Sequence, residues 1–138
     1  MSHIMIHGGG RLKGTLAVQG AKNSVLPILA ATILHPGRTV LRGCPHLSDV
    51  EASIHILQHL GCKAGWEGAD LVVDTSPMSR GDIPDSLMRE MRSSVIFLGA
   101  ILARLGWAEM SYPGGCELGP RPSALHLTAL RQLGAQVT

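Results

Sequence analysis

Aromatic residues, cysteines and long apolar segments are all scarce in this sequence. Phenylalanine, tyrosine and tryptophan make up 3% of the 138 residues, so aliphatic side chains must form most of any core. The three cysteines, Cys44, Cys62 and Cys116, lack metal-ligand or redox spacing, which argues against a disulfide framework and fits a reducing cytoplasm. The longest apolar runs, residues 25–34 and 95–103, fall short of the roughly 20 residues that span a bilayer. Neither a membrane segment nor a secretory signal is predicted.

Excess charge is also missing. Twelve lysines and arginines face ten aspartates and glutamates, which leaves a net charge of +2 with the histidines neutral. Like charges do not form blocks, so a nucleic-acid partner is not predicted. None of the seven histidines lies in a zinc-binding spacing such as His-Glu-x-x-His, and no metal site is predicted. The 45% hydrophobic content predicts one folded domain.

Apolar periodicity and glycine–proline punctuation predict alternating strands and helices, that is, an α/β protein. The predicted order is strands over residues 3–7 and 15–18, a helix body over 25–34, a strand over 39–42, a helix over 48–60, strands over 62–65 and 70–74, a segment 86–92 leading into a helix over 94–105, a strand over 107–112, a helix opened by residues 121–123, and a strand from residue 135.

Helix starts and helix burial can be predicted in more detail. Asn23 or Ser24 is a candidate cap for the first helix, and Pro27 is expected in its first turn. Ser48 with Glu51 forms a candidate capping box. The helices over 25–34 and 94–105 are apolar almost all round, which predicts burial on every side.

The two halves of the chain resemble each other. Gly37 and Gly106 each stop an apolar helix and lie 69 residues apart, whereas Gly61 and Gly134, which follow similar leucine-rich segments, lie 73 apart. This predicts two copies of one strand–helix–strand–helix unit. The four extra residues of the second copy fall between Gly106 and Leu127.

That interval contains a loop, residues 113–122, rich in glycine and proline, which presents Cys116. Such a loop lets backbone approach a ligand closely. A thiol there fits an acid, a base or a nucleophile. A lone cysteine is also commonly an inert, buried apolar residue, so both interpretations stand on this residue alone.

Cationic residues stand at the starts of the two apolar helices. Lys22 with Asn23 precedes the first helix, and Met91 with Arg92 holds the same register in the second copy. A helix N-terminus offers free N–H groups and partial positive charge, so these corners suit phosphate or carboxylate. Anion binding and ordinary solvated charge both remain open.

An ordered set of motifs extends over most of the chain: Gly20-Ala21-Lys22-Asn23, residues 26–31, Leu47-Ser48-Asp49-Val50, Met91-Arg92-Ser93-Ser94, Pro113-Gly114-Gly115-Cys116, Gly119-Pro120-Arg121-Pro122 and Leu125-His126. Together these motifs resemble the UDP-N-acetylglucosamine enolpyruvyl transferases, also called UDP-N-acetylglucosamine 1-carboxyvinyltransferases. The resemblance runs from about Ile4 to the last residue.

The resemblance implies a fold of inside-out α/β repeats, in which βαβαββ units place helices inside and sheets outside. Family members have two domains of three repeats each and are much longer than this chain. Residues 21–138 would then be two of three repeats of one domain, at about 21–76 and 86–138. Residues 1–20 would be strands of the other domain, and the chain would be a front fragment.

The resemblance also implies an activity. The family transfers the enolpyruvyl group of phosphoenolpyruvate to the 3-hydroxyl of UDP-N-acetylglucosamine and releases phosphate, the first committed step of peptidoglycan synthesis. It works in the cytoplasm, without a metal or an organic cofactor. The implied partners are the two substrates and the rest of the enzyme. The isolated chain is expected to be inactive and to self-associate.

Matched motif by motif, the resemblance assigns roles to single residues. Cys116 matches the family's proton donor, which also bonds covalently to phosphoenolpyruvate. Lys22 and Asn23 match the phosphoenolpyruvate site. The residues that match nucleotide-sugar contacts are Arg92, Arg121, Pro122, Ser123, Ala124 and Leu125. Ser123 and Ala124 stand where the family usually has an apolar residue and an aspartate.

Two other functions compete with this one. A related transferase that acts on a shikimate phosphate is disfavoured by Cys116 and by the Gly-Ala-Lys-Asn run. A non-catalytic module that binds nucleotide sugar or a partner is favoured by the short chain and by Ala124.

Overall fold

The computed structural model describes residues 3–91, 93–111 and 124–138 and confirms the α/β class. Its elements are α1 (Lys22–Ala31), the 3-10 turn η1 (Thr32–Leu34), β1 (Arg38–Leu41), α2 (Ser48–His59), β2 (Lys63–Glu67), β3 (Asp70–Asp74), β4 (Asp82–Ile83), α3 (Asp85–Glu90), α4 (Ile96–Leu105), β5 (Glu109–Met110) and α5 (Ala124–Gln132).

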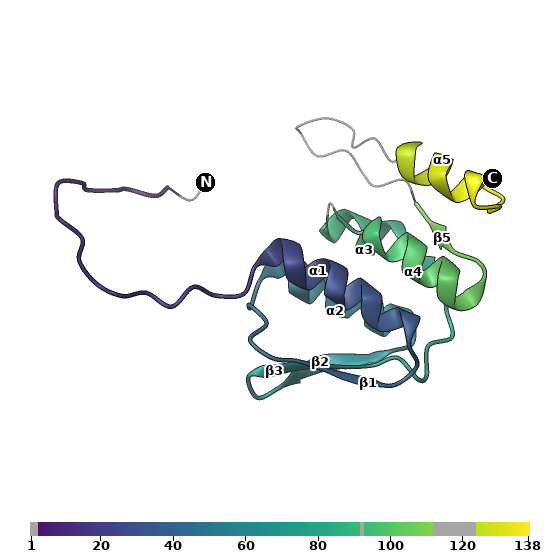
Figure 1. Ribbon diagram of the computed structural model, residues 1–138, viewed down its shortest axis with the longest axis horizontal. Helices are drawn as coiled ribbons and strands as arrows, with labels where there is room; N and C mark the ends of the chain where they lie inside the picture. The colour runs from purple at the N-terminus through teal and green to yellow at the C-terminus, as the bar shows by residue number, and fades with distance from the viewer. Residues whose placement is uncertain (1–2, 92, 112–123) are drawn as a thin grey trace.

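The first unit is a helical layer on an antiparallel sheet. The strand order is β1-β3-β2, with Val73 paired to Thr39 on one side and to Ala64 on the other. The β2–β3 hairpin turns at Gly68, whose φ of 63° suits glycine. Helices α1 and α2 cover one face of this sheet (Figure 1). The predicted bounds of β3 are confirmed, and those of β2 to within two residues.

The second unit begins with a parallel strand pair. Ile83 of β4 lies opposite Met110 of β5, and helices α3 and α4 form the connection between them. Sequence patterning missed β4, because two residues between a glycine and a proline show no periodicity. Strand β5 is shorter than predicted, and Trp107, placed in that strand by the sequence, lies before it and is 49% exposed.

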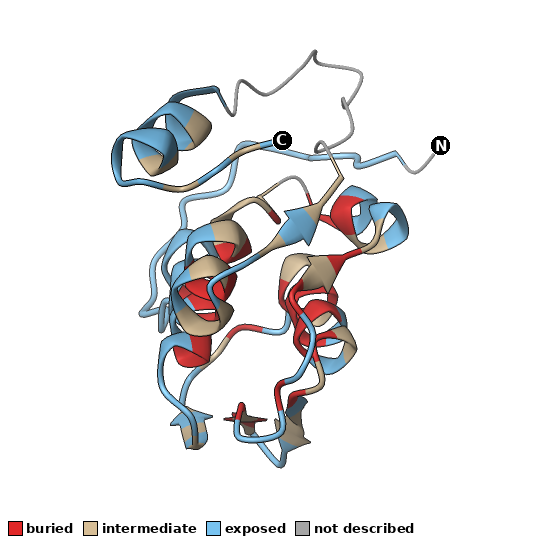
Figure 2. Ribbon diagram, turned by 90° about the vertical axis from the view of Figure 1, so that its right-hand side faces the viewer, coloured by how far each residue is buried: buried red, intermediate tan, exposed pale blue. Residues whose placement is uncertain are grey.

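One core joins the two units. Apolar residues at helical spacing form the buried stripe of α2, since Val50, Leu57 and Leu60 are fully buried and Ile54 is almost so. Leu29 and Ile33 pack in the same cluster as Phe97 and Ile101 of α4. Figure 2 shows the buried positions gathered on facing sides of the helices, with α5 and the N-terminal segment largely exposed. Across the described residues, no helix is both long and apolar enough to cross a membrane.

The predicted burial of two helices on every side is wrong. Ile28 of α1 is 48% exposed and Leu34 of η1 is 55% exposed. Leu98 and Leu102 of α4 are only half-buried, and Ala103 is exposed. The described residues supply neighbours on one side of each helix only, so an apolar surface stays open on the other side.

The predicted helix caps are also wrong. Ala21 caps α1 and Leu47 caps α2, neither with a side-chain hydrogen bond. Glu51 instead accepts a 2.8 Å hydrogen bond from Trp66 Nε1, and the Trp66 ring stacks on His46 at 3.8 Å between centroids. Tertiary contact with β2 therefore takes the carboxylate that a capping box would need.

Pro27 is another correction, because it is the sixth residue of α1 and not part of its first turn. A proline at this place removes the N–H that would donate to the carbonyl of Asn23. Pro27 is exposed, so its ring faces away from the core and the helix continues through it.

The strands predicted over residues 3–7 and 15–18 do not form within the described chain. Residues 3–20 are exposed throughout and extend away from the rest of the molecule (Figure 1). Ile4 is 89% exposed and Leu12 is fully exposed. A strand needs a neighbour to pair with, and these residues have none here. The strand predicted from residue 135 is likewise absent, since residues 135–138 form no regular structure.

Polar contacts between the two units come from one face of α2. His55 Nδ1 lies 3.1 Å from Glu90 Oε2, and His59 Nε2 lies 3.1 Å from Asp82 Oδ2. Arg80 also donates to Asp82 at 3.0 and 2.8 Å. The hydrogen bonds from Arg80 and then His59 hold the pKa of Asp82 well below its usual range.

We expect the isolated chain to self-associate, because its large exposed side chains include Ile28 of α1 and Leu34 of η1 and wet apolar surface costs about 25 cal/mol per Å². Sedimentation velocity over a range of concentrations should show a rising sedimentation coefficient. The double variant Ile28→Lys and Leu34→Lys should shift the distribution towards monomer. A wild-type chain that stays monomeric at high concentration would contradict this prediction.

Replacing Asp82 by Asn should lower the free energy of unfolding by about 1 kcal/mol at pH 7, the upper range for a partly exposed charged network. Because the pKa of Asp82 is lowered by folding, its contribution is present above pH ~4 and is lost as pH falls further. Urea denaturation at pH 7 and pH 3 measures this difference. Asp85→Asn, which removes the exposed pair with Arg89 and the acid in the first turn of α3, is the control and should change stability by a few tenths of a kcal/mol.

Candidate functional site

The start of α1 places a lysine ammonium beside a carboxylate. Lys22 is the first residue of α1, and its Nζ lies 2.5 Å from Asp49 Oδ2 at the start of α2. The Lys22 side chain is 51% exposed and that of Asp49 is 21% exposed. Asn23 follows in the same turn and is exposed. The N–H groups of Lys22 and Asn23 have no acceptor within the helix, whereas the Ser24 N–H donates to the Ala21 carbonyl at 3.0 Å. The corner therefore offers two backbone donors and a cation to solvent.

The pairing with Asp49 changes one argument from the sequence. A lysine at a helix N-terminus opposes the helix dipole, which favoured a functional role for Lys22. The carboxylate of Asp49 offsets that repulsion, so the ion pair gives Lys22 a structural role as well. Sequence reasoning missed this contact, although Asp49 belongs to the Leu-Ser-Asp-Val motif and an acid is favourable in a first helical turn.

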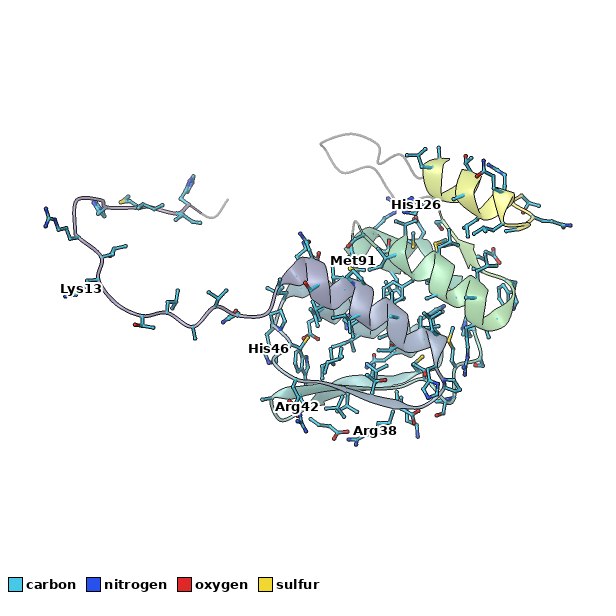
Figure 3. The ribbon with its side chains drawn as sticks, in the orientation of Figure 1. Lys13, Arg38, Arg42, His46, Met91 and His126 are labelled. Atoms are coloured by element: carbon cyan, nitrogen blue, oxygen red, sulfur yellow. The ribbon has the colours of Figure 1, made fainter. Side chains whose placement is uncertain are left out.

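The second predicted corner lies at the end of α3. Met91, labelled in Figure 3, is almost fully buried where α3 packs against α2. Ser53 Oγ of α2 lies 3.5 Å from Met91 Sδ and donates to the Asp49 carbonyl at 2.8 Å. Helix α2 therefore contacts both Lys22 and Met91. Arg92, the predicted cation of this corner, lies outside the described residues.

The loop predicted to carry the chemistry is also outside the described residues. This applies to Cys116, Arg121, Pro122 and Ser123, whose roles stay predictions. Ala124 and Leu125 are described at the start of α5, where both are exposed, Leu125 by 80%. His126, one residue further along α5, is labelled in Figure 3.

Helix α5 packs loosely. Its leucines form an apolar stripe that is only partly covered, since Leu127 and Leu130 are half-buried and Leu133 is 85% exposed. Between α5, α4 and β5 lies a hollow of about 650 Å³ with a mixed polar and apolar lining that includes Leu98 and Leu102. Lys22, Asn23, Ala124 and Leu125 are not among its lining residues, so the hollow is not the predicted anion site.

The two described thiols, Cys44 and Cys62, are poor nucleophiles. Cys62 is 5% exposed, and burial together with the Asp74 carboxylate raises its pKa to about 11. Burial and the nearby Glu51 also raise the pKa of Cys44. Because the thiolate is the reactive form, neither residue is suited to attack an electrophile near neutral pH.

Comparison with known proteins gives a consistent picture. The family EPSP synthase (3-phosphoshikimate 1-carboxyvinyltransferase) matches residues 6–138. The chain is 51% identical over 137 residues to UDP-N-acetylglucosamine 1-carboxyvinyltransferase 2 of Caldanaerobacter subterraneus, covering 99% of this chain and 33% of that protein. It is 45% identical to UDP-N-acetylglucosamine 1-carboxyvinyltransferase of Chlorobium phaeovibrioides, covering all of this chain and 33% of that one. The chain thus spans about a third of the length of these relatives.

A solved structure supports the predicted fold. The enolpyruvyl transferase NikO from Streptomyces tendae superimposes with a TM-score of 0.66 at 28% identity, over 75% of this chain and 24% of that one. The predicted resemblance and the enolpyruvyl transferase-like α/β fold are both confirmed.

Cys116 should be the first thiol to react with an alkylating reagent. A thiol whose pKa rises by one has about tenfold less thiolate at neutral pH. Because the pKa of Cys62 is raised to about 11, Cys62 should react roughly 100-fold more slowly than an ordinary thiol. Limited treatment with iodoacetamide at pH 7.5, followed by peptide mapping, measures the order of labelling. Cys116→Ser should remove the fast phase, and preferential labelling of Cys44 or Cys62 would contradict the prediction.

Proposed function

The chain belongs to the EPSP synthase family, and on that premise we propose that it is part of an enolpyruvyl transferase acting on phosphoenolpyruvate and UDP-N-acetylglucosamine. The observation that carries this proposal is the 45–51% identity to transferases named for that sugar nucleotide, over essentially the whole of this chain. The proposed setting is peptidoglycan synthesis in the cytoplasm.

The first unit supplies part of the phosphoenolpyruvate site in this proposal. Phosphoenolpyruvate carries a phosphate and a carboxylate, so it needs cations and free N–H groups. The Lys22 ammonium and the first turn of α1 provide both at one solvent-facing corner. Asn23 adds an amide to the same turn.

Cys116 supplies the proton in the proposed reaction. The sugar 3-hydroxyl oxygen bonds to carbon 2 of phosphoenolpyruvate while the thiol proton passes to the methylene carbon. The hydroxyl proton goes to a carboxylate that the family provides outside this third of the enzyme. A base then removes a proton from the new methyl group as the bond to phosphate breaks, which restores the enolpyruvyl double bond on the sugar.

The nucleotide sugar is proposed to contact Arg92 and residues 121–125. Ser123 and Ala124 replace the apolar residue and the aspartate that are usual there. With a carboxylate absent at this place, the remaining contacts must come from Arg121 and the backbone. Residues 21–138 are proposed to form two of three repeats, with residues 1–20 pairing to the other domain.

A non-catalytic module that binds nucleotide sugar is the second candidate. It is favoured by Ala124, which stands where the family usually has an aspartate. A shikimate phosphate substrate is disfavoured because the similar curated relatives at 45–51% identity are named for UDP-N-acetylglucosamine.

The 138-residue chain should bind phosphoenolpyruvate weakly at the start of α1 and release no phosphate above background. Titration followed by amide NMR should shift the resonances of residues 22–25. Lys22→Ala should weaken binding by roughly 10-fold or more, the typical loss of a charged hydrogen bond. Lys63→Ala on the exposed strand β2 is the charge-matched control. An equal loss in both variants, or no shift at α1, would contradict the proposed site, and phosphate release at an ordinary rate would contradict the expected inactivity.

A further inference from the structure

The first two turns of α2 support Lys22 at the start of α1. Asp49 and Ser53 lie four residues apart, which places them on one face of the helix. Asp49 forms the ion pair with Lys22, and Ser53 is fully buried beneath it. The α1–α2 interface around this face includes Val25, Leu26 and Val50, all buried, so α2 cannot shift without moving α1.

Ser53 fixes the turn that carries Asp49. Its hydroxyl donates to the Asp49 carbonyl at 2.8 Å, and Met91 Sδ lies on its other side at 3.5 Å. Met91 is 1% exposed, so the second unit closes over this serine. The backbone of Asp49 is therefore fixed by a buried side chain, while its carboxylate forms the ion pair with Lys22 at the surface.

The ammonium of Lys22 needs a partner to stay at the helix start. The N-terminus of α1 repels a cation, and a flexible lysine side chain that is half exposed has many other rotamers. An ammonium has three N–H donors. One can remain on Asp49 while the other two serve an incoming anion.

We propose that Asp49 is a positioning residue for the phosphoenolpyruvate site, because its carboxylate holds the Lys22 ammonium over the first turn of α1. The inference rests on the proposed function of Lys22. By this inference the Asp49 carboxylate strengthens the binding of an anion, although the carboxylate is itself negative. Simple electrostatics predicts the opposite change in affinity, since removal of a nearby negative charge should strengthen anion binding.

Asp49→Asn should therefore weaken phosphoenolpyruvate binding by the 138-residue chain, by roughly five- to tenfold, the range of one charged contact. Asp49→Glu should restore part of the affinity. Asp85→Asn makes the same change of charge on α3, where the pair with Arg89 is exposed, and should leave affinity unchanged or slightly higher. Circular dichroism melts of each variant identify any loss of folding, and Asp49→Glu keeps the test open if Asp49→Asn unfolds.

A second readout needs no ligand. Trace acetylation followed by peptide mapping should show Lys22 reacting roughly two- to fivefold faster in Asp49→Asn, as expected when an exposed ion pair is lost. Lys63 in the same sample is the internal reference. Unchanged reactivity of Lys22 would overturn the inference, and so would tighter phosphoenolpyruvate binding by Asp49→Asn.

The two proposals fail in different ways. If the wild-type chain does not bind phosphoenolpyruvate while Asp49→Asn still accelerates acetylation of Lys22, the proposed site is contradicted and the hold of Asp49 on Lys22 is supported. If wild type binds and both the affinity and the acetylation rate change as expected, both proposals are supported.

Discussion

Aliphatic packing between α1, α2 and α4 is the constraint on which the rest of this structure depends. The sequence has a single phenylalanine, Phe97, and it is fully buried in the same cluster as Leu29 and Leu57. Because the helices share one core, their ends are fixed relative to each other. This is why residues distant along the chain, Lys22 and Asp49, lie in contact at the molecular surface. Packing of the apolar core therefore positions the polar groups at the starts of α1 and α2.

Much of the first unit could be predicted from its sequence, because its signals are local. The α2 stripe and the β2–β3 hairpin each follow from periodicity and a turn. Helix caps were predicted wrongly because a tertiary donor, Trp66, takes the Glu51 carboxylate. The open faces of α1 and α4 could not be predicted either, since an all-apolar helix specifies that it must be covered but not which neighbours are present. The strands expected in residues 3–20 fail for the same reason.

The residues of the candidate site could be predicted from sequence motifs, whereas the contacts between them could not. Lys22 and Asn23 were found as a pair at a helix start, and the structure places them there. The contacts that support them were not found, because Asp49 and Ser53 act across helices and across the two units. Pairings of this kind depend on the packed arrangement, for which a single sequence carries no periodic signal. The roles of Cys116 and Arg121 come from the family motifs alone.

The two tryptophans of the chain fall one in each unit. Trp66 lies half-buried on β2, stacked on His46 and bonded to Glu51, whereas Trp107 is half exposed beside β5. Indole emission depends on contact with water, so the first unit has an emitter in a shielded, polar setting and the second has one that is partly in contact with solvent. The protein thus carries a natural pair of optical reporters. Replacing either by phenylalanine would let the opening of each unit be followed separately by fluorescence.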